Sequence, residues 1–358
     1  MIRVSADALR RQASAILTAW GMPESQADET ASLMVAADLR GIDSHGVAMF
    51  DLYAEHRAMG KIVWAPEIKI VRDGPATGLV DGGGGLGHCP GALAMRLAVE
   101  KAKTVGIGAV AVRNSNHYGA AGVYALMAAD AGLIGVSTTS VWNTAIVPTF
   151  GTDPMFGTNP IAFAAPAGKN PPFVLDMATS TVAIGKVKLA KLLGHDIPEG
   201  WVVDAKGNSV TDPVAAVAGV RRFTPLGSSR QMGGHKGYGL AAMVEILSTM
   251  LPGAWWAPTR GRDHPDADRF NVGHFMLALD PKAFRDDDGF ETDLDSMIDE
   301  LRGANRADAA QPVLVAGDPE RAAVEERTRD GIPLPEARAR ILADIAGKAG
   351  APVLIPAV

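Results

Sequence analysis

Apolar residues recur at helical spacing throughout the first 60 residues of the chain. Leu9 and Ile16 follow this spacing after a capping serine, and the pattern predicts a helix over residues 5–21. The same periodicity predicts helices over residues 24–40 and 49–60, with glycines closing each of them. The chain therefore begins with a helical segment.

From about residue 66 the pattern becomes that of an α/β protein. Apolar or alternating runs predict strands at 67–72, 77–81, 107–112, 133–138, 160–165, 173–176 and 272–279. Helical spacing predicts helices at 90–105, 120–132, 183–194 and 240–251, a hairpin near Gly207 and a helical, acidic tail. The helix at 120–132 lies between two strands, so we expect a β-α-β unit there.

Composition and charge narrow the class of protein. The chain has 358 residues, 40 of them glycine, and a formal net charge of -6, which argues against nucleic acid as a partner. Cys89 is the only cysteine, so no intrachain disulfide can form. The first residues lack an apolar signal region, and no apolar run is long enough to span a membrane. We expect a cytoplasmic protein without a membrane partner.

The segment Asp43-Ser44-His45-Gly46 is the first candidate for chemistry. Asp43 and Ser44 are residues that cap helices, and His45 follows them at an expected helix start. The positive end of a helix dipole disfavours a charged imidazole, which suits proton transfer near neutral pH. A histidine that only packs under a turn is the alternative interpretation of this segment.

The glycine run at Gly82 to Gly87 fits the dinucleotide fingerprint G-x-G-x-x-G, which makes a Rossmann dehydrogenase one hypothesis. That fold also needs an acidic residue at the end of the next strand. The next strand ends in Arg113-Asn114 instead. A flexible loop near a ligand is the favoured interpretation of this run.

Polar loops follow several predicted strands. Residues 113–122 and 156–160 carry many hydrogen-bonding side chains at strand ends, where open α/β sheets bind ligands. Glycines at 233–239 precede a helix and expose backbone N–H groups that suit an anion, to which Lys236 adds charge. Ordinary turns and a surface lysine are the alternative explanations. No metal-ligand spacing, nucleophile elbow or phosphate-binding loop occurs elsewhere in the sequence.

Taken together, these segments resemble the malate/L-lactate dehydrogenase family that does not use the Rossmann fold. The resemblance covers nearly the whole chain in family order. It is carried by Ala37 to Gly46, Asn114 to Gly119, Gly157 to Pro160, Leu175 to Ser180, Gly234 to Gly237 and Gly331 to Leu334. Relatives in that family include ureidoglycolate dehydrogenase, sulfolactate dehydrogenase, 2,3-diketogulonate reductase and piperideine-2-carboxylate reductase.

The resemblance implies an α/β subunit with two lobes. A mixed sheet flanked by helices, residues 73–270, would bind NAD or NADP. A helical lobe would be formed by residues 1–72 together with residues 271–358. The resemblance also implies a homodimer that acts on a small-molecule substrate.

The resemblance further implies roles for individual residues. His45 would be the general acid/base, supported by Ser44, and His117, also a catalytic candidate, would lie near the nicotinamide or the substrate. The cofactor would contact His117, Asp176, Met177, Ala178, Thr179, Ser180, His235, Lys236, Gly317, Asp318 and Glu320. The substrate would contact Tyr53, Thr158 and Asn159.

One position departs from the family pattern. An arginine that usually binds the substrate carboxylate follows His45-Gly46 by three residues, whereas this chain has Met49. Arg57 or Lys236 could take that role, and Ser140-Val141-Trp142-Asn143 suggests a more apolar pocket. The leading hypothesis is hydride transfer between the cofactor and a 2-hydroxy acid/2-oxo acid pair. The alternatives are reduction of a cyclic imine or of a carbonyl without a carboxylate, and a non-catalytic dinucleotide-binding paralogue.

Overall fold

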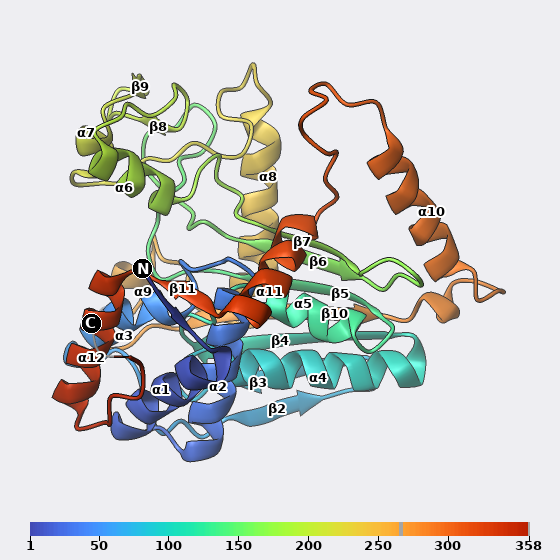
Figure 1. Ribbon diagram of the computed structural model, residues 1–358, viewed down its shortest axis with the longest axis horizontal. Helices are drawn as coiled ribbons and strands as arrows, with labels where there is room; N and C mark the ends of the chain where they lie inside the picture. Colours follow the sequence, from blue (N-terminus) through green and yellow to red (C-terminus); the bar gives the residue numbers. More distant parts are fainter. Residues whose placement is uncertain (265–267, 357–358) are drawn as a thin grey trace.

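A seven-stranded mixed sheet forms the centre of the molecule in the computed structural model, which describes residues 1–264 and 268–356. Its strands lie in the order β2-β3-β4-β10-β5-β6-β7 (Figure 1). They are β2 (Lys69–Asp73), β3 (Thr77–Asp81), β4 (Ile107–Ser115), β5 (Ile134–Thr139), β6 (Ile161–Ala165), β7 (Phe173–Met177) and β10 (Val272–Leu279). The mixed sheet flanked by helices confirms the predicted fold class.

Strand β10 is the middle strand, although it comes last of the seven in the sequence. It pairs antiparallel with β4 on one side, where Met276 lies opposite Val110, and with β5 on the other, where Met276 lies opposite Ser137. Its even-numbered residues from Val272 to Ala278 are buried, whereas Phe275, Leu277 and Leu279 are only partly buried. The parallel strands β4 and β5 are therefore separated by β10, and the expected β-α-β unit between them encloses an additional strand.

Helices cover both faces of this sheet. On one face lie α4 (His88–Val105) and α5 (Gly122–Ala129), which are rich in small residues. Their backbones come close to the strands, and a side chain on Gly108 would collide with the carbonyl of Ala98. On the other face lies α8 (Gly234–Glu245), which continues as one π-helical turn, Ile246–Met250. Ser248 in that turn hydrogen-bonds to Thr138 of β5.

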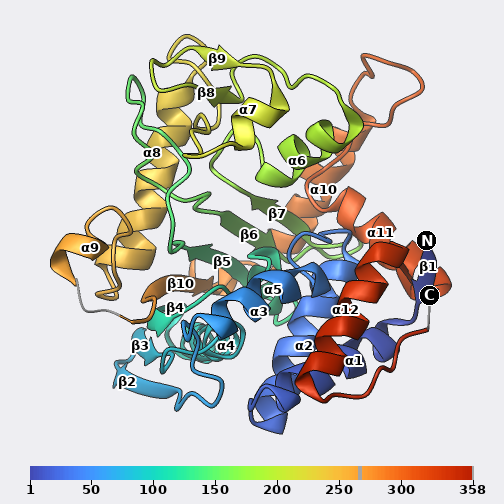
Figure 2. The ribbon, with the colours of Figure 1, turned by 90° about the vertical axis from the view of Figure 1, so that its left-hand side faces the viewer.

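The two ends of the chain form a helical lobe beside the sheet (Figure 2). It contains α1 (Ala6–Ala19), α2 (Glu24–Leu39), the 3₁₀ turn η1 (Val47–Met49), α3 (Phe50–Ala58) and α12 (Glu336–Ala349). A two-stranded sheet joins β1 (Ile2–Val4) to β11 (Ile332–Leu334), so the termini lie side by side. Leu9, Ile16, Phe50, Tyr53 and Leu342 are buried together in the core of this lobe.

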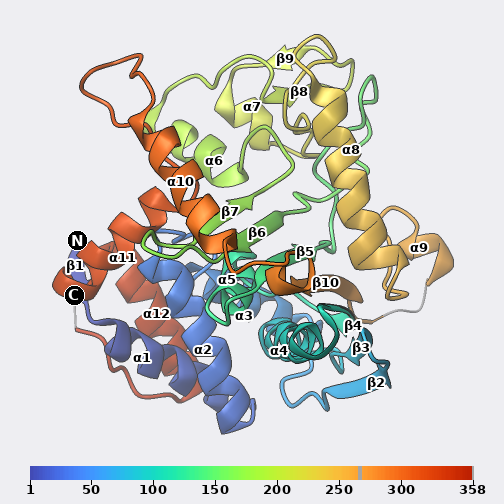
Figure 3. The same ribbon diagram turned by 90° about the vertical axis from the view of Figure 1, so that its right-hand side faces the viewer.

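The remaining elements are peripheral. A small unit above the sheet contains α6 (Ile184–Leu193), β8 (Val202–Val203), β9 (Ser209–Val210) and α7 (Pro213–Val217). Short helices follow at α9 (Arg260–Asp263) and at the 3₁₀ turn Pro281–Ala283. Helix α10 (Phe290–Gly303) lies beyond the edge strand β7, and α11 (Asp318–Asp330) packs against α2 (Figure 3). None of the described helices is both long and apolar enough to cross a membrane.

Several boundaries differ from the sequence-based expectations. The resemblance implies that residues 271–358 belong to the helical lobe, but β10 within this range belongs to the sheet. The pairing of strands that lie far apart in the sequence leaves no local signal. The helix predicted at 240–251 starts six residues earlier, at Gly234, since its glycines are tolerated in a packed helix. Other bounds agree more closely. The strand predicted at 133–138 is β5 and the helix predicted at 183–194 is α6, and the ends of both agree within two residues.

The Gly82–Gly87 run does not belong to a Rossmann fold. It connects β3 to α4 in a parallel β-α-β unit, but the mixed strand order is not that of a doubly wound sheet. The glycines let the chain pack against itself: a side chain on Gly83 would meet the backbone of Glu67, and one on Gly85 would meet Pro66. Close packing of neighbouring segments therefore explains this glycine run.

Candidate functional site

The turn between α2 and η1 positions His45. The backbone N–H of His45 donates to the carbonyl of Ile42 (2.9 Å), and the N–H of Val47 donates to the carboxylate of Asp38 (2.9 Å). Gly46 is required here because a Cβ at this position would lie 2.0 Å from Oδ1 of Asp38. The turn is thus built around a buried carboxylate on the last helical turns of α2.

The local environment of His45 differs from the expected one. His45 precedes the 3₁₀ turn at Val47 rather than starting an α-helix, and neither Asp43 nor Ser44 caps that turn. Instead, Oγ of Ser44 lies 2.8 Å from Nδ1 of His45 in hydrogen-bond geometry. Burial, not a helix dipole, lowers the pKa of His45 below its usual value. The predicted neutral imidazole is therefore present for a different physical reason.

His117 lies after β4 and is held by two donors at one ring nitrogen. The hydroxyl of Tyr53 lies 2.8 Å from Nδ1 of His117, and the backbone N–H of Gly119 donates to the same atom (3.2 Å). A backbone N–H can only donate, so Nδ1 accepts and the proton of the neutral ring resides on Nε2. Burial and the neighbouring histidines, His45 first among them, hold the pKa of His117 well below its usual value. His117 is therefore a neutral hydrogen-bond donor.

Tyr53, predicted to contact substrate, is fully buried on α3, and its hydroxyl is engaged by His117. Below it lies His88, which is also fully buried and has no hydrogen-bond partner for either ring nitrogen among the described residues. Burial lowers the pKa of His88 to about 3, so this ring is neutral. Tyr53 and His88 form the floor beneath His117.

The rings of His45 and His117 come together from positions 72 residues apart in the sequence. Their centroids lie 5.6 Å apart and the planes are inclined by 27°. The arrangement pairs one imidazole that can exchange a proton with one that can only donate a hydrogen bond while neutral. Such a pair can protonate and stabilise an oxygen on which negative charge develops.

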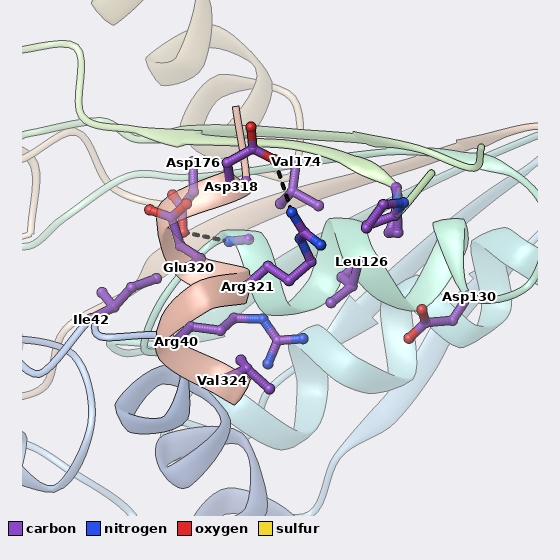
Figure 4. A pocket seen from close by; sticks show the side chains of 14 residues that line it. Arg40, Ile42, Leu126, Asp130, Val174, Asp176, Asp318, Glu320, Arg321 and Val324 are labelled. Atoms are coloured by element: carbon purple, nitrogen blue, oxygen red, sulfur yellow. Dashed lines mark hydrogen bonds and ion pairs between the residues drawn. The ribbon is translucent and has the colours of Figure 1, made fainter. Parts of the chain in front are cut away.

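A cavity of about 260 Å³ lies between α5, α11 and the end of α2 (Figure 4), and neither His45 nor His117 is among its lining residues. It shares Ile42 with the turn that holds His45. Its polar lining comes from Arg40, Asp130, Asp176, Asp318, Glu320 and Arg321, and Gly122 and Gly317 contribute backbone. Four of the predicted cofactor contacts, Asp176, Gly317, Asp318 and Glu320, are therefore brought together at one cavity.

Asp176 is the polar centre of this cavity. The backbone N–H of Gly122, at the start of α5, donates to its Oδ2 (2.7 Å), and a Cβ on Gly122 would lie 2.8 Å from the same oxygen. Burial, followed by repulsion from Glu320, raises the pKa of Asp176 to about 6. Asp318 is held differently, in an ion pair with Arg302 (2.6 Å).

The residues after β7 lead away from the cavity. Met177 ends the strand and Ala178 follows it. The N–H of Thr179 donates to the carbonyl of Thr158 (2.9 Å), and the hydroxyl of Ser180 donates to the carbonyl of Val182. The first contact joins the segment after β7 to the polar loop at 156–160, and the second is local to that segment.

Asn159, predicted to contact substrate, is fully buried, with a left-handed φ of 36°. Its amide donates to Ala241 and to the carboxylate of Glu245 on α8. Its Oδ1 has no hydrogen-bond partner among the described residues. The side chain thus ties the loop after Gly157 to α8.

His235 and Lys236 lie in the first turn of α8, where Gly233 adopts a left-handed φ of 93°. Nδ1 of His235 is buried without a partner among the described residues, and Lys236 is exposed. In the described part of the chain, no hydrogen bond or ion pair joins these two residues to the cavity around Asp176. The predicted cofactor contacts therefore fall into two groups, one at the cavity and one at the start of α8.

Arg57 and Lys236 were suggested in place of the missing arginine. Among the described residues, neither makes a hydrogen bond with His45 or His117. The guanidinium of Arg57 lies over the ring of Trp20, 5.8 Å from its centroid, in the helical lobe. Asp38 and Arg327 were not predicted to have a role at the site. A lone carboxylate on the otherwise apolar face of the helix at 24–40 is the signal that could have identified Asp38.

Comparison with known proteins adds a second line of observation. The family model described as malate/L-lactate dehydrogenase matches residues 4–343. The chain is 42% identical to malate dehydrogenase of Pyrococcus abyssi, over 93% of this chain and 91% of the relative. It is 37% identical to (2R)-3-sulfolactate dehydrogenase (NADP(+)) of Chromohalobacter salexigens, over 76% of this chain and 80% of the relative.

Two solved structures extend the likeness to three dimensions. The crystal structure of malate dehydrogenase from Entamoeba histolytica superposes with a TM-score of 0.91 at 31% identity, covering 98% of this chain and 99% of the other. That of Δ1-piperideine-2-carboxylate reductase from Pseudomonas syringae superposes with a TM-score of 0.84 at 28% identity, covering 97% and 100%.

Proposed function

Because the chain belongs to the malate/L-lactate dehydrogenase family, we propose that His45 is its general acid/base in hydride transfer between NAD(P) and a 2-hydroxy acid/2-oxo acid pair. The chain is an oxidoreductase of the malate and sulfolactate dehydrogenase type, acting on a CH–OH group. The observation that carries the proposal is the pairing of His45 with His117, 5.6 Å apart, with His45 in a turn that begins at Ile42 of the cavity lining.

The two histidines have different roles toward the substrate oxygen: one transfers a proton and the other donates a hydrogen bond. When the carbonyl carbon accepts a hydride, negative charge develops on its oxygen. His45 in its protonated form gives that oxygen a proton, and in the reverse direction neutral His45 accepts it. Nε2–H of His117 donates a hydrogen bond to the same oxygen, and Ser44 orients the ring of His45. Because both rings lie in largely buried surroundings, each interaction is stronger than it would be in water.

The cavity fits part of a dinucleotide. Its volume of about 260 Å³ is close to the lower limit of roughly 300 Å³ for small-molecule pockets, enough for an adenosine but not for the whole cofactor. The carboxylates of Asp176 and Glu320 suit ribose hydroxyls, which donate hydrogen bonds. Lys236 and the N-terminus of α8 suit phosphates. A bound nicotinamide cofactor supplies or accepts the hydride. We also propose the two-lobe division, the homodimer and the cytoplasmic location expected for this family.

A second candidate function follows from Met49. Without an arginine three residues after Gly46, a cyclic imine or a carbonyl without a carboxylate remains an alternative substrate. The likeness to a piperideine-2-carboxylate reductase favours this candidate over a non-catalytic paralogue.

The decisive test is His45→Gln, assayed for NADH and NADPH oxidation against a panel of 2-oxo acids and cyclic imines. We expect kcat to fall by about two orders of magnitude or more with the affinity for NADH unchanged. His195→Gln, at an exposed histidine, is the matched control. Near-normal turnover of His45→Gln would reject the assignment. A wild-type protein that binds NADH but reduces nothing in the panel would favour the non-catalytic alternative.

A further inference from the structure

An aromatic wall stands next to the histidine pair. We use this name for Trp142, His56 and Phe270. The ring of Trp142 meets His117 edge to face, with centroids 6.3 Å apart and planes at 76°, and meets His56 at 4.8 Å and 85°. Phe270 stacks on Trp142, at 5.7 Å and 27°, and also contacts His56. No residue of this wall carries a permanent charge.

Neighbouring contacts fix the wall in place. The backbone carbonyl of Trp142 accepts a hydrogen bond from Nη1 of Arg260 (3.3 Å). The guanidinium of Arg260 lies 5.0 Å from the centre of the Phe270 ring, and Nζ of Lys61 lies 6.0 Å from it. Phe270 is 7% exposed and His56 is 5% exposed, whereas Trp142 is only partly buried. Trp142 is thus the member of the wall that has accessible ring surface.

Two cations contact the wall itself, and a third lies in the helical lobe. Arg260 and Lys61 lie against Phe270, and Arg57 lies against Trp20. Among the described residues, no lysine or arginine makes an ion pair or hydrogen bond with His45 or His117. Met49 packs against the apolar core of the helical lobe. A second acid group on the substrate would therefore meet aromatic carbon rather than a cation beside these histidines.

We infer that the aromatic wall binds the side chain of the substrate and selects 2-oxo acids with an aromatic or apolar side chain. Trp142 is the residue that determines this specificity. The inference rests on the proposed function and names its substrate class. Aromatic rings gain from edge-to-face and stacked contacts beyond the area they bury, whereas a carboxylate placed there loses water without gaining a partner.

The test compares phenylpyruvate, pyruvate and oxaloacetate as substrates of the full-length protein, with NADH and NADPH as reductants. All three share the 2-oxo acid end, so their ratios isolate the side chain. We expect kcat/KM for phenylpyruvate to exceed that for oxaloacetate by about tenfold or more. Trp142→Ala should lower kcat/KM for phenylpyruvate by about tenfold and leave pyruvate within about threefold, and Trp142→Phe should restore most of the loss.

Trp201→Phe is the matched control, because Trp201 packs in the small unit around Val202, away from the wall. Each variant is checked for an unchanged thermal transition, and NADH binding is measured directly by fluorescence. A wild-type preference for oxaloacetate would overturn the inference, as would an equal loss for all three substrates in Trp142→Ala. Weakened NADH binding in Trp142→Ala would assign the ring to the cofactor instead. Failure to reduce any 2-oxo acid would reject the proposed function itself.

Discussion

Arg327, on α11, holds Asp43, two residues before His45, through both of its terminal nitrogens. Its Nη1 also donates to the backbone carbonyl of Asp38 at the end of α2. One side chain from α11 thus fixes two points of the chain just before His45. Arg327 is 11% exposed and Asp43 is 57% exposed, so solvent screens this ion pair from the Asp43 side.

Removing this anchor should impair activity more than stability. We expect Arg327→Ala to lower kcat about tenfold or more, because the loss of charge-assisted hydrogen bonds of about 1.5–3 kcal/mol frees the turn around His45. Arg327→Lys should recover part of the rate, since a single ammonium cannot bridge both oxygens. Arg329→Ala is the control, because Arg329 lies on the same helix and pairs only with Asp330. Steady-state kinetics with all three variants checks this, and a normal rate in Arg327→Ala would contradict it.

Asp38 should make the stability of the protein depend on pH. Burial raises its pKa to about 8, against an ordinary value of 3.8. The folded state then binds a proton more tightly than the unfolded state, so its contribution to stability is present below about pH 4 and is lost as the pH rises toward 8. We expect a slope of about -1.4 kcal/mol per pH unit from this group within that window.

Asp38→Asn isolates this effect, because asparagine keeps an acceptor for the N–H of Val47. Urea unfolding at pH 5, 6, 7 and 8 should show a flatter pH dependence for this variant than for the wild type. Asp286→Asn, at an exposed position, serves as the control. Identical slopes for wild type and Asp38→Asn would show that Asp38 is ionised in the folded protein at neutral pH.

Tyr53 should act on catalysis only through His117. Tyr53→Phe removes the 2.8 Å hydrogen bond to Nδ1 and leaves Gly119 as the remaining donor. We expect kcat to fall by about tenfold with little change in KM, and the protonation of His117 observed by ¹⁵N NMR to shift away from a pure Nε2–H form. Tyr238→Phe is the control, because the hydroxyl of Tyr238 makes no hydrogen bond to any residue that the structure describes. A raised KM with unchanged kcat and NMR signals would instead make Tyr53 a substrate contact.

The cavity should favour NADH over NADPH. If its carboxylates hold the adenosine ribose, the 2′-phosphate of NADPH is repelled by Asp176 and Glu320. Glu320→Gln should therefore narrow the difference in Kd between NADH and NADPH, measured by titration calorimetry without substrate. Glu300→Gln, at an exposed position on α10, is the control. Tighter binding of NADPH than of NADH by the wild type would contradict the assignment of the ribose to this cavity.

Local patterns were sufficient to predict most elements but not how they combine. The helix predicted at 5–21 is α1, and the strand predicted at 107–112 is the first part of β4, because amphipathic spacing and β-branched runs are local properties. The approach of His45 to His117 depends on contacts between the helical lobe and the loop after β4, such as that of Tyr53 with His117, which no local pattern encodes. Arg57 illustrates the opposite case. Its position in the sequence was compatible with a role at the site, but its guanidinium lies over the ring of Trp20.

The roles of individual polar residues were the least accessible from the sequence. Asp38 and Arg327 lie 289 residues apart, so the position of Asp38 on the apolar face of its helix could not indicate Arg327 as its partner. Asn159 lies in a loop rich in hydrogen-bonding side chains, yet its amide donates a hydrogen bond to Glu245 of its own chain. Whether a polar side chain faces a ligand or its own chain is decided by tertiary contacts that periodicity does not encode.

The position of β10 has a consequence for how the chain is made. During synthesis, β4 and β5 leave the ribosome more than 130 residues before β10, which must insert between them. Until then, each of the two strands exposes unpaired N–H and C=O groups along an edge that can join another chain. The late arrival of its middle strand makes folding of the nascent sheet slow and dependent on nearly the full length. Protection of these two edges by a chaperone, rather than the stability of the finished fold, would then limit the yield of the protein in a cell.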